Sequence, residues 1–337
     1  MKRIHFFSVL LLILMLIPSC SQKDKRPFYE ADISDIDIDD VRISRYEEVL
    51  FNLNPFIIKE ELIPYHDEFY FFLGEGIHEP EGQQQLYNYV TDPFLIELYL
   101  DSKDIWSDLS ELRSSLNRVF RFYKYHFADE AIPRIYTYIS GVDYNPPVIY
   151  ADGHLVMALD KYLGADYIYY DQLKIPRYLS RWMFPEMLPA DVVRALADKH
   201  LEAVSPEPRT LLDHMIHAGK KQFFIDCMLP RIHDSLKISY TGSQLEWISG
   251  NEGFVWAYKL DNELLYSTDQ ATIQLFLGKA PFTSAFSRQS APQTGVWIGW
   301  QIVRDYMRRN PEITLQELIK ETDARKILTG ARYRPGR

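Results

Sequence analysis

The chain has 337 residues, of which 47% are hydrophobic, 14% aromatic and 25% charged, and its formal net charge is −10 at pH 7. This apolar content is enough for a sizeable core, so a wholly disordered chain is excluded, and the modest glycine and proline content excludes a collagen-like one. The acidic balance, without a long basic tract, excludes nucleic acid as an expected partner.

Residues 1–19 have the pattern of a secretory signal peptide. Lys2 and Arg3 precede a nearly unbroken apolar run over residues 6–17, which would be about 18 Å long as a helix and too short to cross a hydrocarbon core comfortably. A basic start, a short apolar run and small residues before a cleavage point are typical of a secretory signal. The run ends in Ile-Pro-Ser-Cys20, which resembles the lipobox of bacterial lipoproteins, with the proline as a departure.

The lipobox resemblance implies that Cys20 becomes the acylated first residue of the mature chain, with the membrane as its partner through this lipid. A soluble secreted protein cut nearby is the alternative. Ser21, in place of Asp, follows the acylated position and favours the outer membrane, with the protein facing the periplasm. The second cysteine, Cys227, lies in an apolar run and is predicted to be buried.

Residues 20–35 are expected to form the acylated cysteine and a tether, and residues 36–335 a single α+β domain. Ile36, Ile38, Val41 and Ile43 alternate with acidic residues, which predicts a strand within residues 32–45 with an acidic outer face. A calcium loop is the alternative for this acidic run, but the run lacks the glycine and the closing glutamate of such a loop.

The rest of the chain predicts a mostly helical protein with a small mixed β-sheet. Helical spacing of apolar residues dominates residues 45–130 and returns after residue 175. Short β-branched or aromatic runs at 134–139, 148–150 and 155–159 predict strands, with Asp152-Gly153 as a hairpin turn. The later helices are predicted over residues 189–204, 209–229, 241–260 and 295–310. The third of these begins with the capping box Thr241-x-x-Gln244, and a last helix opens at the capping box Thr314-x-x-Glu317.

The helix predicted over residues 209–229 carries the one pattern with recognisable chemistry. Asp213, His214, His217, Lys220 and Lys221 fall within a 120° sector of a helical wheel, so two imidazoles and a carboxylate share one face. Side chains of this kind bind zinc, and a third ligand from a following helix is common. The alternative is an amphipathic helix with this polar face in water and both lysines solvated.

Compared with the His-Glu-x-x-His helix of zincins, this segment has the wrong residues. Alignment on His217 puts Asp213 in the place of the first histidine and His214 in the place of the catalytic glutamate, which activates water. The carboxylates that follow at the appropriate place in the chain are Glu246 and Glu252. The sequence lacks a Gly-x-Ser-x-Gly elbow, a Walker loop and a dinucleotide-binding glycine motif.

Several stretches together resemble the GldB gliding-motility lipoprotein family. They are Val148-Ile-Tyr-Ala, Met157-Ala-Leu-Asp-Lys-Tyr-Leu-Gly164, Thr210-Leu-Leu-Asp213 leading to Gly219-Lys220, Gln244-Leu-Glu-Trp247, Leu264-Leu-Tyr-Ser-Thr-Asp269 and Gly295-x-Trp-Ile-Gly-Trp300. The resemblance runs in order over about residues 36–335. It implies an envelope lipoprotein of Gram-negative gliding bacteria and their relatives, associated with surface motility and its linked secretion apparatus. It also implies a zincin-like scaffold in which the His-Glu-x-x-His motif is degenerate.

Two functions follow from this resemblance. The favoured one is a membrane-anchored, non-catalytic accessory component without a cofactor, whose partners are other envelope proteins of the motility or secretion apparatus. The alternative is a divergent zincin-type peptidase in which Asp213, His214, His217 and Glu252 hold zinc.

Overall fold

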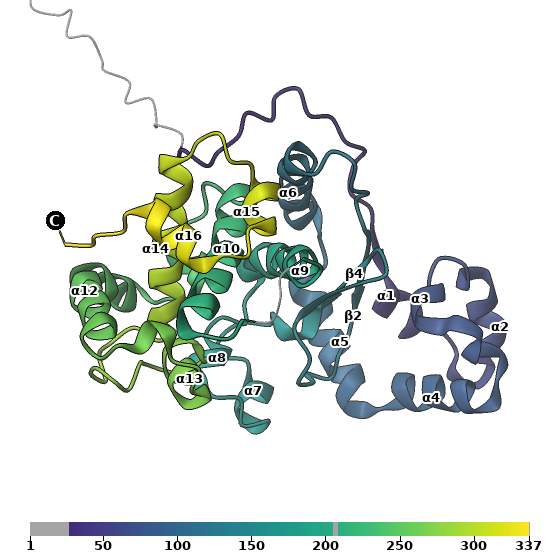
Figure 1. The fold of residues 1–337 in the computed structure, drawn as a ribbon. Coiled ribbons are helices and arrows are strands. Elements are labelled where there is room, and N and C mark those ends of the chain that lie inside the picture. The colour runs from purple at the N-terminus through teal and green to yellow at the C-terminus, as the bar shows by residue number, and fades with distance from the viewer. Residues whose placement is uncertain (1–26, 205–207, 337) are drawn as a thin grey trace, which may run out of the picture.

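The computed structural model describes residues 27–204 and 208–336 (Figure 1). Helices dominate this part of the chain, which also contains a four-stranded sheet in the order β1-β2-β4-β3. The strands are β1 (Ile43–Arg45), β2 (Arg134–Tyr138), β3 (Val148–Ala151) and β4 (His154–Ala158). β2 is parallel to both of its neighbours, whereas β3 and β4 are antiparallel. The predicted α+β class with a small mixed sheet is therefore confirmed.

The turn between β3 and β4 is the hairpin that Asp152-Gly153 predicts. Ala151 pairs with His154 across it, and the two turn residues have φ of +47° and +79°. A two-residue hairpin of this kind needs positive φ at both central positions, where glycine and aspartate are favoured.

The strand predicted within residues 32–45 is wrong for most of its length, because β1 has only three residues. The isoleucines at 36 and 38 are half-buried and the intervening aspartates are exposed, as the alternation requires. However, the backbone here is bound by side chains of α6 (Ser110–His126) and does not pair with a strand. Arg121 donates to the carbonyls of Ile33 and Ile36 at 2.6 and 2.9 Å, and Asn117 accepts from the Val41 amide at 2.8 Å.

A helical lobe follows β1 and projects to one side of the molecule (Figure 1). Within the stretch expected to be helical, residues 55–78 form short α and 3₁₀ segments, with Pro64 and Gly74 among the residues that interrupt them. The lobe has a small core of its own around Leu50, Leu62 and Phe69. Its helices, with α5 leading back to the sheet, are α1 (Tyr46–Leu50), α2 (Ile58–Leu62), α3 (Tyr70–Leu73), α4 (Pro80–Thr91) and α5 (Pro93–Ile105), with 3₁₀ turns at Pro55–Ile57, Ile63–Tyr65 and Gly74–His78.

The main core is built in layers from the sheet outwards (Figure 1). α9 (Leu188–Glu202) packs on β3, α10 (Leu211–Met228) packs on α6 and α9, and α14 (Thr294–Arg309) packs on α10. Cys227 on α10 is 2% exposed, as expected.

Two glycines allow α10 and α14 to approach until their backbones touch. A Cβ on Gly219 would lie 2.3 Å from the carbonyl oxygen of Gly299, and a Cβ on Gly299 would lie 1.8 Å from that of Met215. Both distances are far below van der Waals contact, so the crossing requires glycine at both positions. This crossing fixes how the polar face of α10 is oriented in the core.

The outer helices cover this core. Thr241 and Thr314 begin two of them with the capping boxes that the sequence predicts. None of the helices within residues 27–204 and 208–336 has the length and apolar character needed to span a membrane. The remaining helices are α7 (Ile168–Gln172), α8 (Arg177–Ser180), α11 (Asp234–Ile238), α12 (Gly242–Asp261), α13 (Gln270–Leu277), α15 (Leu315–Lys320) and α16 (Ala324–Ala331), with 3₁₀ turns at Leu159–Lys161, Pro185–Met187 and Leu264–Tyr266.

Candidate functional site on α10

Asp213 is used to begin α10. Its carboxylate accepts a hydrogen bond from the backbone amide of Thr210 at 2.9 Å, and its own amide donates to the Thr210 hydroxyl at 3.2 Å. This reciprocal pair is a capping box, which satisfies two amides that would otherwise have no partner at the helix start. The first predicted ligand therefore has a local structural role.

His214 and His217 lie on the next turn and are both half-buried. Burial, and then the neighbouring charge of Lys220, lower the pKa of His217. Its imidazole is therefore neutral at pH 7, the form in which histidine binds metals. The same lysine opposes a cation at this place, because it adds a positive charge on the same face.

The expectation that both lysines are solvated is wrong for Lys220, which is only 4% exposed. Its ammonium donates to the backbone carbonyls of Ile319 and Glu321, at the C-terminal end of α15. Burial lowers its pKa to about 8. Lys221 forms an ion pair with Asp198 of α9 at 2.5 Å. The polar face of α10 thus binds two neighbouring helices.

Glu252 lies on α12 and joins three parts of the C-terminal half. Its two carboxylate oxygens accept hydrogen bonds from the indole of Trp297 on α14, at 2.7 Å, and from the hydroxyl of Tyr333 after α16, at 2.8 Å. Burial and the Glu252 carboxylate raise the pKa of Tyr333, so its hydroxyl keeps the proton that it donates.

Among residues 27–204 and 208–336, no group of three or more His, Cys, Asp or Glu side chains has an arrangement that could hold a metal ion. A groove of about 890 Å³ between residues 37–44, 67–68 and 132–136 includes none of Asp213, His214, His217 or Glu252 in its lining. The zinc assignment stays a prediction, as does acylation at Cys20, which lies outside the described residues together with the signal peptide.

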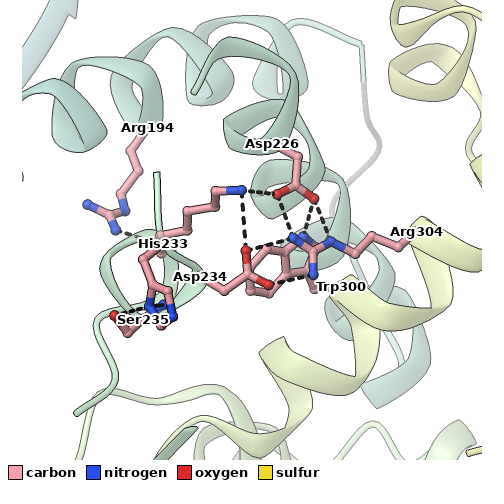
Figure 2. Close-up of polar contacts among 8 residues, drawn as sticks. Arg194, Asp226, His233, Asp234, Ser235, Trp300 and Arg304 are labelled. Carbon is pink, nitrogen blue, oxygen red and sulfur yellow. Dashed lines mark hydrogen bonds and ion pairs between the residues drawn. The ribbon is translucent and has the colours of Figure 1, made fainter. Parts of the chain in front are cut away.

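The strongest polar arrangement on α10 is a buried cluster near its C-terminal end (Figure 2). Asp226, which is 0% exposed, accepts hydrogen bonds at 2.7 Å from Lys237, from the indole of Trp300 and from two nitrogens of Arg304. Arg304 also binds both carboxylate oxygens of Asp234, at 2.8 and 2.9 Å. We call these five residues the ion cluster.

The ion cluster balances its charges, with two carboxylates facing one ammonium and one guanidinium. Burial alone would raise the pKa of Asp234, but its hydrogen bonds from Arg304 outweigh burial and hold the pKa below the ordinary value. Burial would lower the pKa of Arg304, but its hydrogen bonds to Asp226 and then to Asp234 outweigh burial and raise this pKa. Buried charges are tolerated when they are paired and hydrogen-bonded in this way.

The short helix that carries two cluster residues is held at both ends (Figure 2). The side chain of His233 caps the first turn of α11 by accepting from the amide of Ser235, and Arg194 of α9 donates to the carbonyls of Leu236 and Lys237 at 3.2 and 2.7 Å. The cluster therefore fixes α10, α11 and α14 to one another.

Sequence reasoning missed the ion cluster, although one signal was available. Asp226 interrupts the apolar stretch Phe-Phe-Ile-Asp-Cys-Met-Leu at 223–229, and a charge within a buried helical run requires a partner of opposite charge. The pattern does not say which residue that partner is, because Arg304 is 78 positions away.

Comparison with known proteins gives one match. A family model described as gliding motility protein GldB matches residues 28–335. Neither the curated proteins nor the solved structures contain a match. Because the matched residues cover most of the sequence, including the ion cluster and the whole of α10, the chain belongs to the GldB gliding-motility protein family.

Proposed function

We propose that this protein is a membrane-anchored envelope lipoprotein that acts as a non-catalytic accessory component in gliding motility and its linked secretion apparatus. The observation that carries the proposal is the family match over residues 28–335, which begins eight positions after the Cys20 that ends a lipobox-like segment. The lipid would hold the protein at the outer membrane, facing the periplasm, where it would contact other envelope proteins of the same apparatus.

The non-catalytic part of the proposal is supported by what the polar residues of α10 do. Asp213 caps the helix, Lys220 binds α15 and Asp226 holds the ion cluster together. We further propose that the scaffold is zincin-like and that its metal-binding helix has taken on these structural roles. A divergent zinc peptidase remains the competing function, since the neutral imidazole of His217 could bind a metal.

The anchor is tested in cells by metabolic labelling with palmitate and by fractionation. The wild-type chain is expected to carry label and to sediment with membranes, and Cys20→Ser is expected to lose both. An unlabelled wild-type protein would overturn the anchor.

The non-catalytic role is tested by complementing a deletion strain. His214→Ala combined with His217→Ala is expected to restore surface gliding as the wild type does. Zinc bound at one equivalent in the purified wild-type protein, lost together with gliding in the double variant, would overturn this role and establish the peptidase alternative.

A further inference from the structure

The first described residues are fixed to the body of the protein. The ring of Tyr29 lies over the ion cluster, 5.1 Å from the ammonium of Lys237 and 5.4 Å from the guanidinium carbon of Arg304. The carboxylate of Glu30 forms an ion pair with Arg231 at 2.9 Å, and the Glu30 side chain is only 7% exposed. A cation–π contact and an ion pair with a buried carboxylate thus hold two consecutive residues.

The attachment continues along the segment. Two side chains of α6 bind its backbone. Arg121 donates to the carbonyls of Ile33 and Ile36, and Asn117 accepts from the amide of Val41. We call residues 28–41 the strap. Residues 28–35, expected from the sequence to be part of a tether, therefore lie against α10, α14 and α6 (Figure 1).

Covalent geometry limits how far the strap can be from a lipid on Cys20. Pro27 lies seven positions after Cys20, and a fully extended chain spans at most about 3.6 Å per residue, which gives about 25 Å. This is less than the thickness of a small domain. An anchor at Cys20 therefore requires the point where the strap begins to stay close to the bilayer.

The surface at that point has side chains suited to a lipid headgroup region. Phe28 is 47% exposed, and its ring lies 5.0 Å from the guanidinium carbon of Arg308. Arg308 and Arg309, at the end of α14, are both exposed, as is Arg231 beside the strap. We call these four residues the strap face. Arg308 also pairs with Asp305, and Arg231 pairs with Glu30, so the net charge of the strap face is small. Its attraction for lipid would therefore come mainly from hydrogen bonds between guanidinium groups and lipid phosphates.

We propose that the strap face lies against the membrane surface and that the strap fixes this orientation, which directs the lobe of α1–α4 away from the bilayer. Figure 1 shows the start of the strap at the upper edge of the molecule near α14, and the lobe at the lower right, beyond the sheet. The proposal rests on the lipid anchor at Cys20. Without fixed contacts at Tyr29 and Glu30, the same lipid would allow any face to approach the bilayer.

The test uses the mature chain, residues 20–337, coupled through Cys20 to a maleimide lipid in vesicles that contain phosphatidylglycerol. Cys227 is 2% exposed, so Cys20 is the thiol left for coupling. Hydrogen exchange is compared between vesicle-bound protein, isolated by flotation, and uncoupled protein. Amides in segments 229–236 and 308–314 are expected to exchange several-fold more slowly on vesicles, whereas those of α4 stay unchanged.

A matched variant separates the strap from the lipid. Twenty Gly/Ser residues inserted between Cys20 and Pro27 add a flexible reach of about 25 Å and are expected to remove most of the slowing in both segments. Slowing in α4, or equal exchange at the strap face with and without vesicles, would overturn the orientation. Chemical coupling does not depend on acylation in the cell, so this failure is distinct from a failure of the palmitate experiment.

Discussion

A buried amine on α12 makes the stability of this protein depend on pH. Lys259 is 0% exposed, and its ammonium nitrogen lies 4.3 Å from the ring centre of Phe276 and 5.8 Å from that of Phe286. It has no hydrogen-bond partner among the described residues. Burial lowers the pKa of Lys259 to about 7.

The direction of the effect follows from proton binding in the two states. Below pH 7 the amine is protonated both folded and unfolded, so the cost of burying the charge is fully present. Between pH 7 and 10.5 the unfolded chain binds a proton that the folded chain lacks, and stability rises with pH by up to about 1.4 kcal/mol per unit. Over this pH range the gain adds up to about 3 to 5 kcal/mol, which is the net cost of burying the charge after the aromatic contacts have offset part of it.

Lys259→Met removes the charge and keeps a long apolar side chain. Relative to its effect near pH 10.5, it is expected to raise the free energy of unfolding by about 3 to 5 kcal/mol more at pH 6 and by about 2 kcal/mol more at pH 9. Urea unfolding across this range measures the difference. The exposed Lys320 on α15 gives the control, and Lys320→Met is expected to change stability little and equally at every pH. A gain from Lys259→Met that is the same at pH 6 and pH 10 would refute the reasoning.

Two further substitutions test the core. Gly299→Ala would place a Cβ 1.8 Å from the Met215 carbonyl oxygen, and it is expected to lower the free energy of unfolding in urea by more than about 3 kcal/mol. Gly250 on α12 has open space around it, so the control Gly250→Ala is expected to raise this free energy by about 0.5 to 1 kcal/mol. Similar effects at both positions would contradict the backbone contact. Asp226→Asn removes the buried one of the two carboxylates that face Lys237 and Arg304, and it is expected to cost about 3 to 5 kcal/mol, measured in the same way. A change below about 1 kcal/mol would show that the ion cluster does not hold the helices together.

The features that the sequence predicts correctly are those decided within a few residues. The hairpin at Asp152-Gly153 and the capping boxes at Thr241 and Thr314 depend on residues at most three positions apart, so their geometry can be deduced locally. The strand expected before Val41 fails for a different reason. Alternation tells which side chains point inwards, but not whether the backbone pairs with a strand or with side chains such as Arg121.

The polar face of α10 shows the same limit for the candidate site. A helical wheel correctly places Asp213, His217 and Lys220 in one sector of α10. It gives the direction of each side chain from the helix axis, but not which other parts of the protein pack against that sector. The carbonyls at the end of α15 occupy part of that sector and bury Lys220. Since residues 319–321 are about a hundred positions away, their presence could not be read from the spacing.

The environment of α10 also bears on whether a metal could bind there. A cation at His217 would have to overcome the charge of Lys220, and Lys220 is held in place by backbone carbonyls that do not move without α15. The Asp213 carboxylate already accepts from the Thr210 amide through Oδ2 in the capping box, so a cation there would share this charge with the helix start. Zinc binding would therefore compete with contacts that stabilise the fold, whereas a non-catalytic role leaves these contacts as they are.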